Sequence, residues 1–257
     1  MAGHTPSMDE LLERRACECR LTPDRALGTL DEAEEFLRDR GLLTRTTDSA
    51  LPSLFEACHE EPYAPDKPGF GQWPATKYPW FGELGTRGYP VLAVHRGKSL
   101  LVTEEVAQLM DPICRAEIAR MEAADPEWAR LLRHLAETGP SELEDMQVEL
   151  GLKPKELKSL RAPLERCGAI VSRALVYEDP HRHTSELSRW DQVLPEPAEG
   201  SGLADVIVAG VRAAVVAPAK EIARWFSWQW YWDDAILEDE RLVHVDGHVT
   251  SAETASA

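Results

Sequence analysis

The chain has 257 residues, of which 43% are hydrophobic and 28% charged, a composition typical of a globular protein with room for two or three small domains. Asp and Glu number 45 against 28 Lys and Arg, and the resulting net charge of −17 disfavours a surface that binds nucleic acid everywhere. No apolar run approaches the roughly 20 residues that span a bilayer, no secretory signal is visible, and five irregularly spaced cysteines suit a reducing compartment. We therefore expect a cytoplasmic protein without a membrane partner.

The N-terminal part of the chain predicts a winged-helix-like module over residues 8–62, after a disordered tail at 1–7. Its clearest helix has Thr29 as N-cap, acidic residues in the first turn and Gly41 after the last turn. A short strand at 42–46 and a helix at 51–59 follow. The module is acidic where a DNA-binding surface would be basic. We therefore consider a protein as the alternative partner of this module.

Residues 63–118 have a different character. The first part, 63–81, is rich in Pro, Gly and aromatic residues and predicts a loop. Apolar runs on either side of Arg96-Gly97 then predict a β-hairpin. A helix is expected from Val102 to Glu117, with a break at Asp111-Pro112.

Residues 119–193 predict a complete winged helix. Trp128, Leu131, Leu132 and Leu135 share one helix face, and Gly139-Pro140 ends that helix. A second helix is expected to begin at Ser141, because Glu144 three residues later completes a capping-box pattern, and to end before Gly151.

The third helix of this module is expected over residues 155–167, with a kink or an early end at Pro163. A strand rich in β-branched residues follows at 169–177, and then a polar turn at 178–183. Three helices, a strand and a loop follow one another in the order of a winged helix-turn-helix, whose third helix normally enters the major groove of DNA.

Basic residues concentrate on this third helix and the wing that follows it. Between residues 153 and 173 there are six basic residues and two acidic ones, although a solvated helix face would account for the same pattern. The candidate DNA-binding residues are Lys153, Lys155, Lys158, Arg161, Arg166 and Arg173, together with His181, Arg182 and His183 at the wing. We interpret the histidines as a polar wing tip or a phosphate contact rather than metal ligands, and expect no metal and no cofactor.

The last module is expected over residues 202–250, after a linker at 194–201. An apolar helix at 203–217, a second helix from Pro218 to about Trp225 and a hairpin turn at Asp246-Gly247 repeat the winged-helix order. Residues 251–257 are expected to be disordered. The predicted fold is thus mainly α with small β-hairpins (α+β), built from tandem winged helix-turn-helix modules.

Aromatic residues form two clusters, and packing is their first explanation. Six aromatics lie between residues 225 and 232, too many to face one core. Exposed members could stack on an unpaired base, or contact a planar drug or a protein. The candidate stacking or pocket residues are Trp73, Trp80, Trp228, Trp230 and Trp232.

Several passages of the chain resemble actinobacterial proteins described as AlkZ-related, over most of its length. These passages are residues 51–55, 58–63, 95–100, 179–187 and 208–224. Such proteins are in turn similar to the YcaQ/AlkZ family of tandem winged-helix DNA glycosylases, which excise alkylated or crosslinked purines. The resemblance implies a tandem winged-helix fold with DNA as partner.

The family uses a glutamine–apolar–glutamine motif in catalysis, and this chain lacks it. Its glutamines are Gln72, Gln108, Gln147, Gln192 and Gln229, of which no two lie two residues apart. No catalytic residue is therefore carried over from the family.

The function we expect is binding of duplex DNA through the central module. A first alternative is a glycosylase that acts on alkylated or crosslinked bases, in which Asp191 or Gln192 would replace the missing motif and tryptophans would line the pocket. A second alternative is a protein-interaction module that has lost DNA binding.

Overall fold

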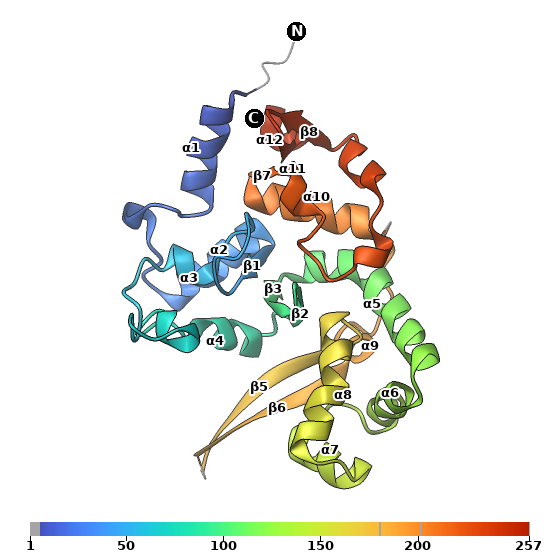
Figure 1. Cartoon of the computed structure of the whole chain (residues 1–257). Coiled ribbons are helices and arrows are strands. Elements are labelled where there is room, and N and C mark those ends of the chain that lie inside the picture. Colours follow the sequence, from blue (N-terminus) through green and yellow to red (C-terminus); the bar gives the residue numbers. More distant parts are fainter. Residues whose placement is uncertain (1–5, 180, 201, 257) are drawn as a thin grey trace.

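The computed structural model describes residues 6–179, 181–200 and 202–256 (Figure 1). Three bodies of helices, each with a small sheet, follow one another along the chain. In Figure 1 the first lies to the left, the last at the top and right, and the central one at the bottom, where a long hairpin projects from it.

The first body contains two short 3-10 turns and the hairpin that we expected in a separate segment. Its elements are α1 (Met8–Glu18), α2 (Leu30–Arg40), β1 (Leu42–Thr44), α3 (Leu54–Ala57), α4 (Trp80–Thr86), β2 (Val91–His95) and β3 (Lys98–Val102). The Thr29 side chain accepts a hydrogen bond from the Glu32 amide, and Gly41 ends α2 at a φ of 80°, as predicted. Since β1 pairs with β3, the hairpin belongs to the same sheet as the N-terminal strand.

Helix α5 (Glu104–Ala124) connects the first body to the central one and continues through Pro112, so the predicted break is wrong. Its middle is bonded to residues of other elements. The fully buried Asp111 pairs with Arg115 and accepts hydrogen bonds from Trp190 Nε1 at 2.7 Å and the Ala198 amide at 2.9 Å. These contacts offset the one backbone hydrogen bond that a proline removes.

The central body has the predicted three helices and a longer wing than expected. Its elements are α6 (Pro126–Thr138), β4 (Ser141–Glu142), α7 (Leu143–Leu150), α8 (Pro154–Arg166), β5 (Ile170–Glu178), β6 (His181–Arg189) and α9 (Trp190–Val193). Ser141 lies in β4 and does not cap α7; its hydroxyl donates to the Gly139 carbonyl. Glu144 instead accepts a hydrogen bond from Thr184, and α8 continues past Pro163.

The last body contains α10 (Leu203–Ala214), β7 (Val216–Pro218), α11 (Ala219–Ile222), two 3-10 turns (Gln229–Tyr231 and Asp234–Glu238), β8 (Leu242–Val245), β9 (His248–Ser251) and α12 (Ala252–Ser256). The turn at Asp246-Gly247 joins β8 to β9 as predicted. Disorder was expected from residue 251, but the structure places α12 there. Thr254 is buried, its amide bonds Ser251 Oγ, and its carbonyl accepts from Arg14.

All three sheets have the same topology. Their strand orders are β1-β3-β2, β4-β6-β5 and β7-β9-β8. In each body the third strand therefore lies in the centre of the sheet, with the first strand on one side and its hairpin partner on the other. Every pairing between these strands is antiparallel. A helix precedes the first strand and helical segments separate it from the hairpin, which is the order of a winged helix. The α+β class and the tandem arrangement are therefore as predicted.

One hydrophobic core connects the three bodies. Its largest buried side chains include Trp190, Trp225 and Trp228, each fully inaccessible. Trp228 Nε1 donates to the Cys167 carbonyl at 2.8 Å and so fastens the last body to the end of α8. All five cysteines are free. Over the described ranges, no helix has the length and apolarity that a membrane span requires.

Candidate nucleic-acid interface and adjoining cavity

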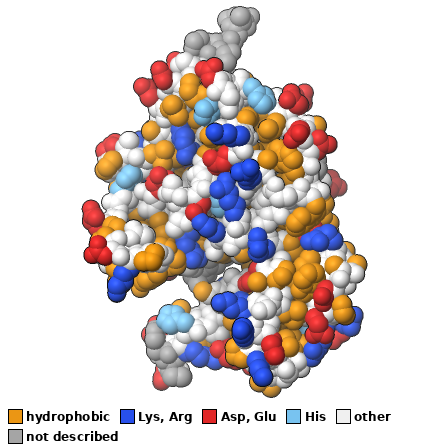
Figure 2. Space-filling model, in the orientation of Figure 1, with side chains coloured by type: hydrophobic (Ala, Val, Ile, Leu, Met, Phe, Trp, Pro, Cys, Tyr) orange, Lys and Arg blue, Asp and Glu red, His pale blue; other side chains and the backbone are white. Residues whose placement is uncertain are grey.

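Helix α8 and its N-cap residue present three lysines on the surface of the central body. Leu157 and Leu164 are buried against the core, and this spacing turns Lys153, Lys155 and Lys158 to solvent. No ion pair involves these three lysines within the part of the chain that the structure describes. Figure 2 shows a band of Lys and Arg side chains down the middle of one face, with most acidic side chains toward its edges.

The three arginines predicted beside these lysines are placed differently. Arg161 pairs with Glu165 at 3.1 Å, and Arg173 on β5 pairs with Glu186 at 2.9 Å. Arg166 lies against the β2–β3 turn, where its Nε is 3.1 Å from the position that a Cβ on Gly97 would take. Arg166 therefore lies at the boundary with the first body, and carboxylates offset the charges of Arg161 and Arg173.

The wing is a long antiparallel hairpin of β5 and β6. Arg182 stacks over the Tyr177 ring at 4.8 Å and pairs with Glu142 at 2.9 Å. His183 is exposed on the same strand, and His181 begins β6 with a side chain outside the described set. The predicted DNA-binding residues thus fall into a lysine group at α8, three arginines of which two are paired with carboxylates, and a wing group.

The five tryptophans that were candidates for base stacking or for a ligand pocket lie in separate places. Trp73 contacts Phe70 and Trp80 lies under Lys77, both in the first body. Trp228 is fully buried. Trp230 is 52% exposed and donates to the buried Glu117 at 2.9 Å, while Trp232 donates to Asp234. Trp228 is thus a core residue, and Trp230 is the exposed member of the five.

The residues suggested as replacements for the glycosylase motif are engaged in local structure. Asp191 forms an ion pair with Arg189. Gln192 donates to the Leu135 carbonyl and accepts from the Arg189 amide. Both side chains therefore fasten α9 to its surroundings.

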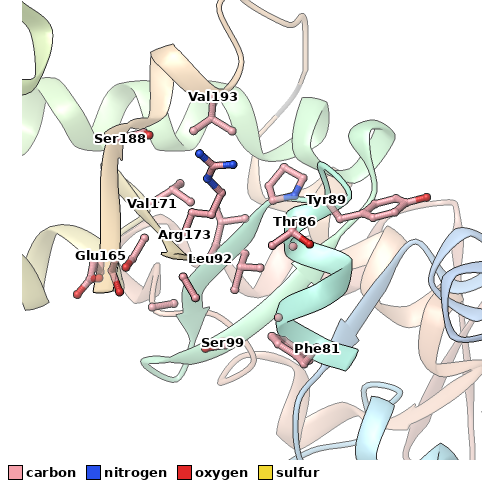
Figure 3. Close-up of a pocket in the computed structure, with 18 of the residues that line it drawn as sticks. Phe81, Thr86, Tyr89, Leu92, Ser99, Glu165, Val171, Arg173, Ser188 and Val193 are labelled. Carbon is pink, nitrogen blue, oxygen red and sulfur yellow. The ribbon is translucent and has the colours of Figure 1, made fainter. Parts of the chain in front are cut away.

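A cavity of about 470 Å³ lies between the first and central bodies, and it was not predicted from the sequence. One wall comes from α4 and β2, the other from β5 and β6 with the end of α8 (Figure 3). Apolar and small side chains make up most of the lining. The charged residues that line it are Arg45, Glu165 and Arg173.

The electrostatics of this cavity differ between its two walls. Burial raises the pKa of Glu165, an effect that the neighbouring Arg161 opposes. Arg45 lies between the rings of Trp73 and Phe81, at 5.0 and 4.6 Å, and donates to Ser99 Oγ at 3.3 Å. Burial alone lowers its pKa, since no acidic group opposes the effect. The one local feature of this site in the sequence is an arginine directly after the buried strand Leu42–Thr44, and that feature does not indicate the opposite wall.

Comparison with known proteins shows which solved structure has a similar fold. No protein-family model and no curated protein sequence matches the chain. Among solved structures, the Streptomyces sahachiroi DNA glycosylase AlkZ is similar with a TM-score of 0.59 and 12% sequence identity, over 98% of this chain and 71% of that one. The chain thus has the fold of this glycosylase, at the level of remote similarity.

Proposed function

We propose that this protein binds duplex DNA through α8 of its central winged helix. The observation that carries the proposal is the group of three exposed lysines without carboxylate partners among the described residues, on the helix that enters the major groove in winged-helix proteins. The glycosylase fold supports DNA as the partner.

The overall negative charge is compatible with this role. Phosphate neutralisation by lysine supplies most of the non-specific affinity of a DNA-binding protein, and it needs only one basic surface. Acidic residues elsewhere repel the duplex and so restrict contact to that surface. A chain with a net charge of −17 is thus expected to bind DNA in one orientation.

The test is binding to a labelled duplex across roughly 50 to 200 mM salt. We expect affinity to fall steeply with salt, and the Lys155→Gln, Lys158→Gln double variant to lower the slope of the log–log plot by about 2, one for each lost phosphate contact. Lys67→Gln with Lys220→Gln is the matched control, because both lysines are exposed and lie in other bodies. An unchanged slope in the α8 variant, or no binding at the lowest salt, would refute the proposal and favour a protein partner.

A second function, excision of alkylated bases, is favoured by the similarity to the glycosylase AlkZ over nearly the whole chain. An alkylated duplex incubated with the protein and then treated with alkali would break at each abasic site. Breaks confined to the alkylated duplex would establish glycosylase activity. Binding without breaks would leave the protein a DNA-binding protein alone.

A further inference from the structure

We propose that the cavity between α4 and β5 binds a small flat organic anion of the aromatic carboxylate class, with Arg45 as its anion-binding group. This site is separate from the lysine group on α8, and the proposal does not depend on DNA binding.

The shape of the cavity suits a flat apolar body. Its volume of about 470 Å³ lies within the range of roughly 300–1,000 Å³ found for small-molecule sites. Gly82 and Gly85 line one wall, and Ser172 and Ala174 line the other, so both walls carry small residues. Figure 3 shows Val171 and Leu92 directed toward this space from the two walls, which gives an apolar ring surfaces to contact.

The charge of the lining indicates an anion. Glu186 offsets the charge of Arg173, and Arg161 offsets that of Glu165. Arg45 has no carboxylate partner among the residues that the structure describes. The lining therefore carries one positive charge that nothing in the described chain balances.

The setting of Arg45 indicates how the anion would be held. Arg45 is half-buried, and even partial burial of a cation without a counter-ion is costly. The rings of Trp73 and Phe81 offset only part of that cost. The Arg45 Nε is buried without a hydrogen-bond partner. Because the Nε has no accessible surface, a ligand in the cavity would meet the terminal nitrogens, of which Nη2 also donates to Ser99 Oγ. A carboxylate matches the pair of N–H groups that these two nitrogens present.

The size and position of the site exclude a polyanion. The cavity lies at a boundary between two packed bodies, and its walls are mostly apolar. A nucleic-acid backbone carries a charge at every residue, and this lining offers one unbalanced cation. A single carboxylate on one or two fused rings fits both the charge and the apolar surface.

The test uses the full chain and two probes, 1-naphthoate and the uncharged 1-naphthamide, with titration calorimetry and thermal unfolding as readouts. We expect naphthoate to bind and raise the melting temperature, and the amide to bind about tenfold or more weakly. Arg45→Met should weaken naphthoate binding by a similar factor. Arg224→Met, an exposed arginine in the last body, is the matched control and should bind naphthoate like the wild type.

A second variant separates loss of binding from loss of folding. Thr86 lines the cavity from the end of α4 (Figure 3), and Thr86→Phe fills the space while leaving Arg45 in place. This variant should also lose naphthoate binding. Equal affinity for the acid and the amide, naphthoate binding that survives either substitution, or no binding of naphthoate to the wild type would overturn the proposal. Inorganic phosphate that competes with naphthoate equally well would overturn the choice of an aromatic ligand.

Discussion

At the scale of single residues, His95 shows how burial sets the charge of a side chain. It ends β2 with no accessible surface, and its Nε2 lies 3.4 Å from Ser49 Oγ. Burial, aided by the nearby charge of Arg96, lowers its pKa to about 4. The imidazole is therefore neutral in the folded protein over a pH range in which the unfolded chain binds a proton.

This difference predicts a loss of stability on acidification. Since the folded pKa is depressed, the unfolded state binds more protons between pH 6.5 and pH 4, and the free energy of unfolding falls as pH decreases through that window. From pH 6.5 to 4.5 the contribution of His95 should fall by roughly 2 kcal/mol. Urea unfolding at both pH values checks this.

The His95→Gln variant isolates the contribution of His95 to the pH dependence of stability, because every other titrating group is the same in both proteins. We expect it to be less stable than the wild type at pH 6.5 and to lose less stability on acidification. Parallel pH dependence of the two proteins would contradict the assignment.

At the scale of elements, the turn between α7 and α8 sets the position of the lysine group. Gly151 ends α7 at a φ of 63°, in the left-handed region that costs other residues about 1 kcal/mol or more. The turn it makes sends the chain into α8 three residues later. Glycine therefore has the lowest conformational cost at this position.

We predict that Gly151→Ala lowers the free energy of unfolding by about 1 kcal/mol. Gly82→Ala is the matched control. It lies within α4 without a positive φ, a Cβ there meets no atom within 4 Å, and alanine should stabilise the helix by about 0.5 kcal/mol or more. Chemical denaturation measures the free energy of unfolding of both variants. If both substitutions stabilise the protein, or both destabilise it, the role of the Gly151 conformation is refuted.

The elements that could be predicted from sequence are those with strong local signals. The helix after Thr29 has a cap, charged turns and a terminal glycine, and α8 has apolar residues on one face. Strand β6 was missed because His181–Arg189 is mostly polar, and its pairing with β5 rather than its composition makes it a strand. Strand β4 was missed because Ser141 and Glu144 imitate a capping box while pairing with β6 decides the structure.

The cavity could not be predicted, for a similar reason. Arg45 and Phe81 belong to the first body, and Glu165 and Val171 to the central one, so the site exists only where two bodies meet. Local patterns carry no information on that packing. The lysines of α8, in contrast, lie within one helix, and the sequence was sufficient to group them.

At the scale of the whole molecule, the shared core predicts cooperative unfolding. One cluster of buried side chains takes members from all three bodies, and Trp228 lies within it. We predict a single calorimetric transition for the wild type. Trp228→Ala should cost about 3–5 kcal/mol and separate the unfolding of the last body as an earlier transition.

Trp232→Ala is the comparison for that experiment. Its indole is half-buried and donates a hydrogen bond to Asp234 two residues along. We therefore expect a smaller loss in the free energy of unfolding and a single transition. Two transitions already in the wild type would show that the bodies unfold independently.

The three sheets also differ in how much chain their first and last strands enclose. Val216 pairs with Thr250, Ser141 with Leu187 and Leu42 with Val102, so the enclosed loop lengthens from the last body to the first. Closing a longer loop costs more chain entropy, and contacts between distant residues form later in folding. The last body is thus the one whose sheet closes most readily, and the first body is the one whose sheet completes last during refolding. In pulse-labelling hydrogen exchange, the amides of β1 and β3 should gain protection after those of β7 and β9.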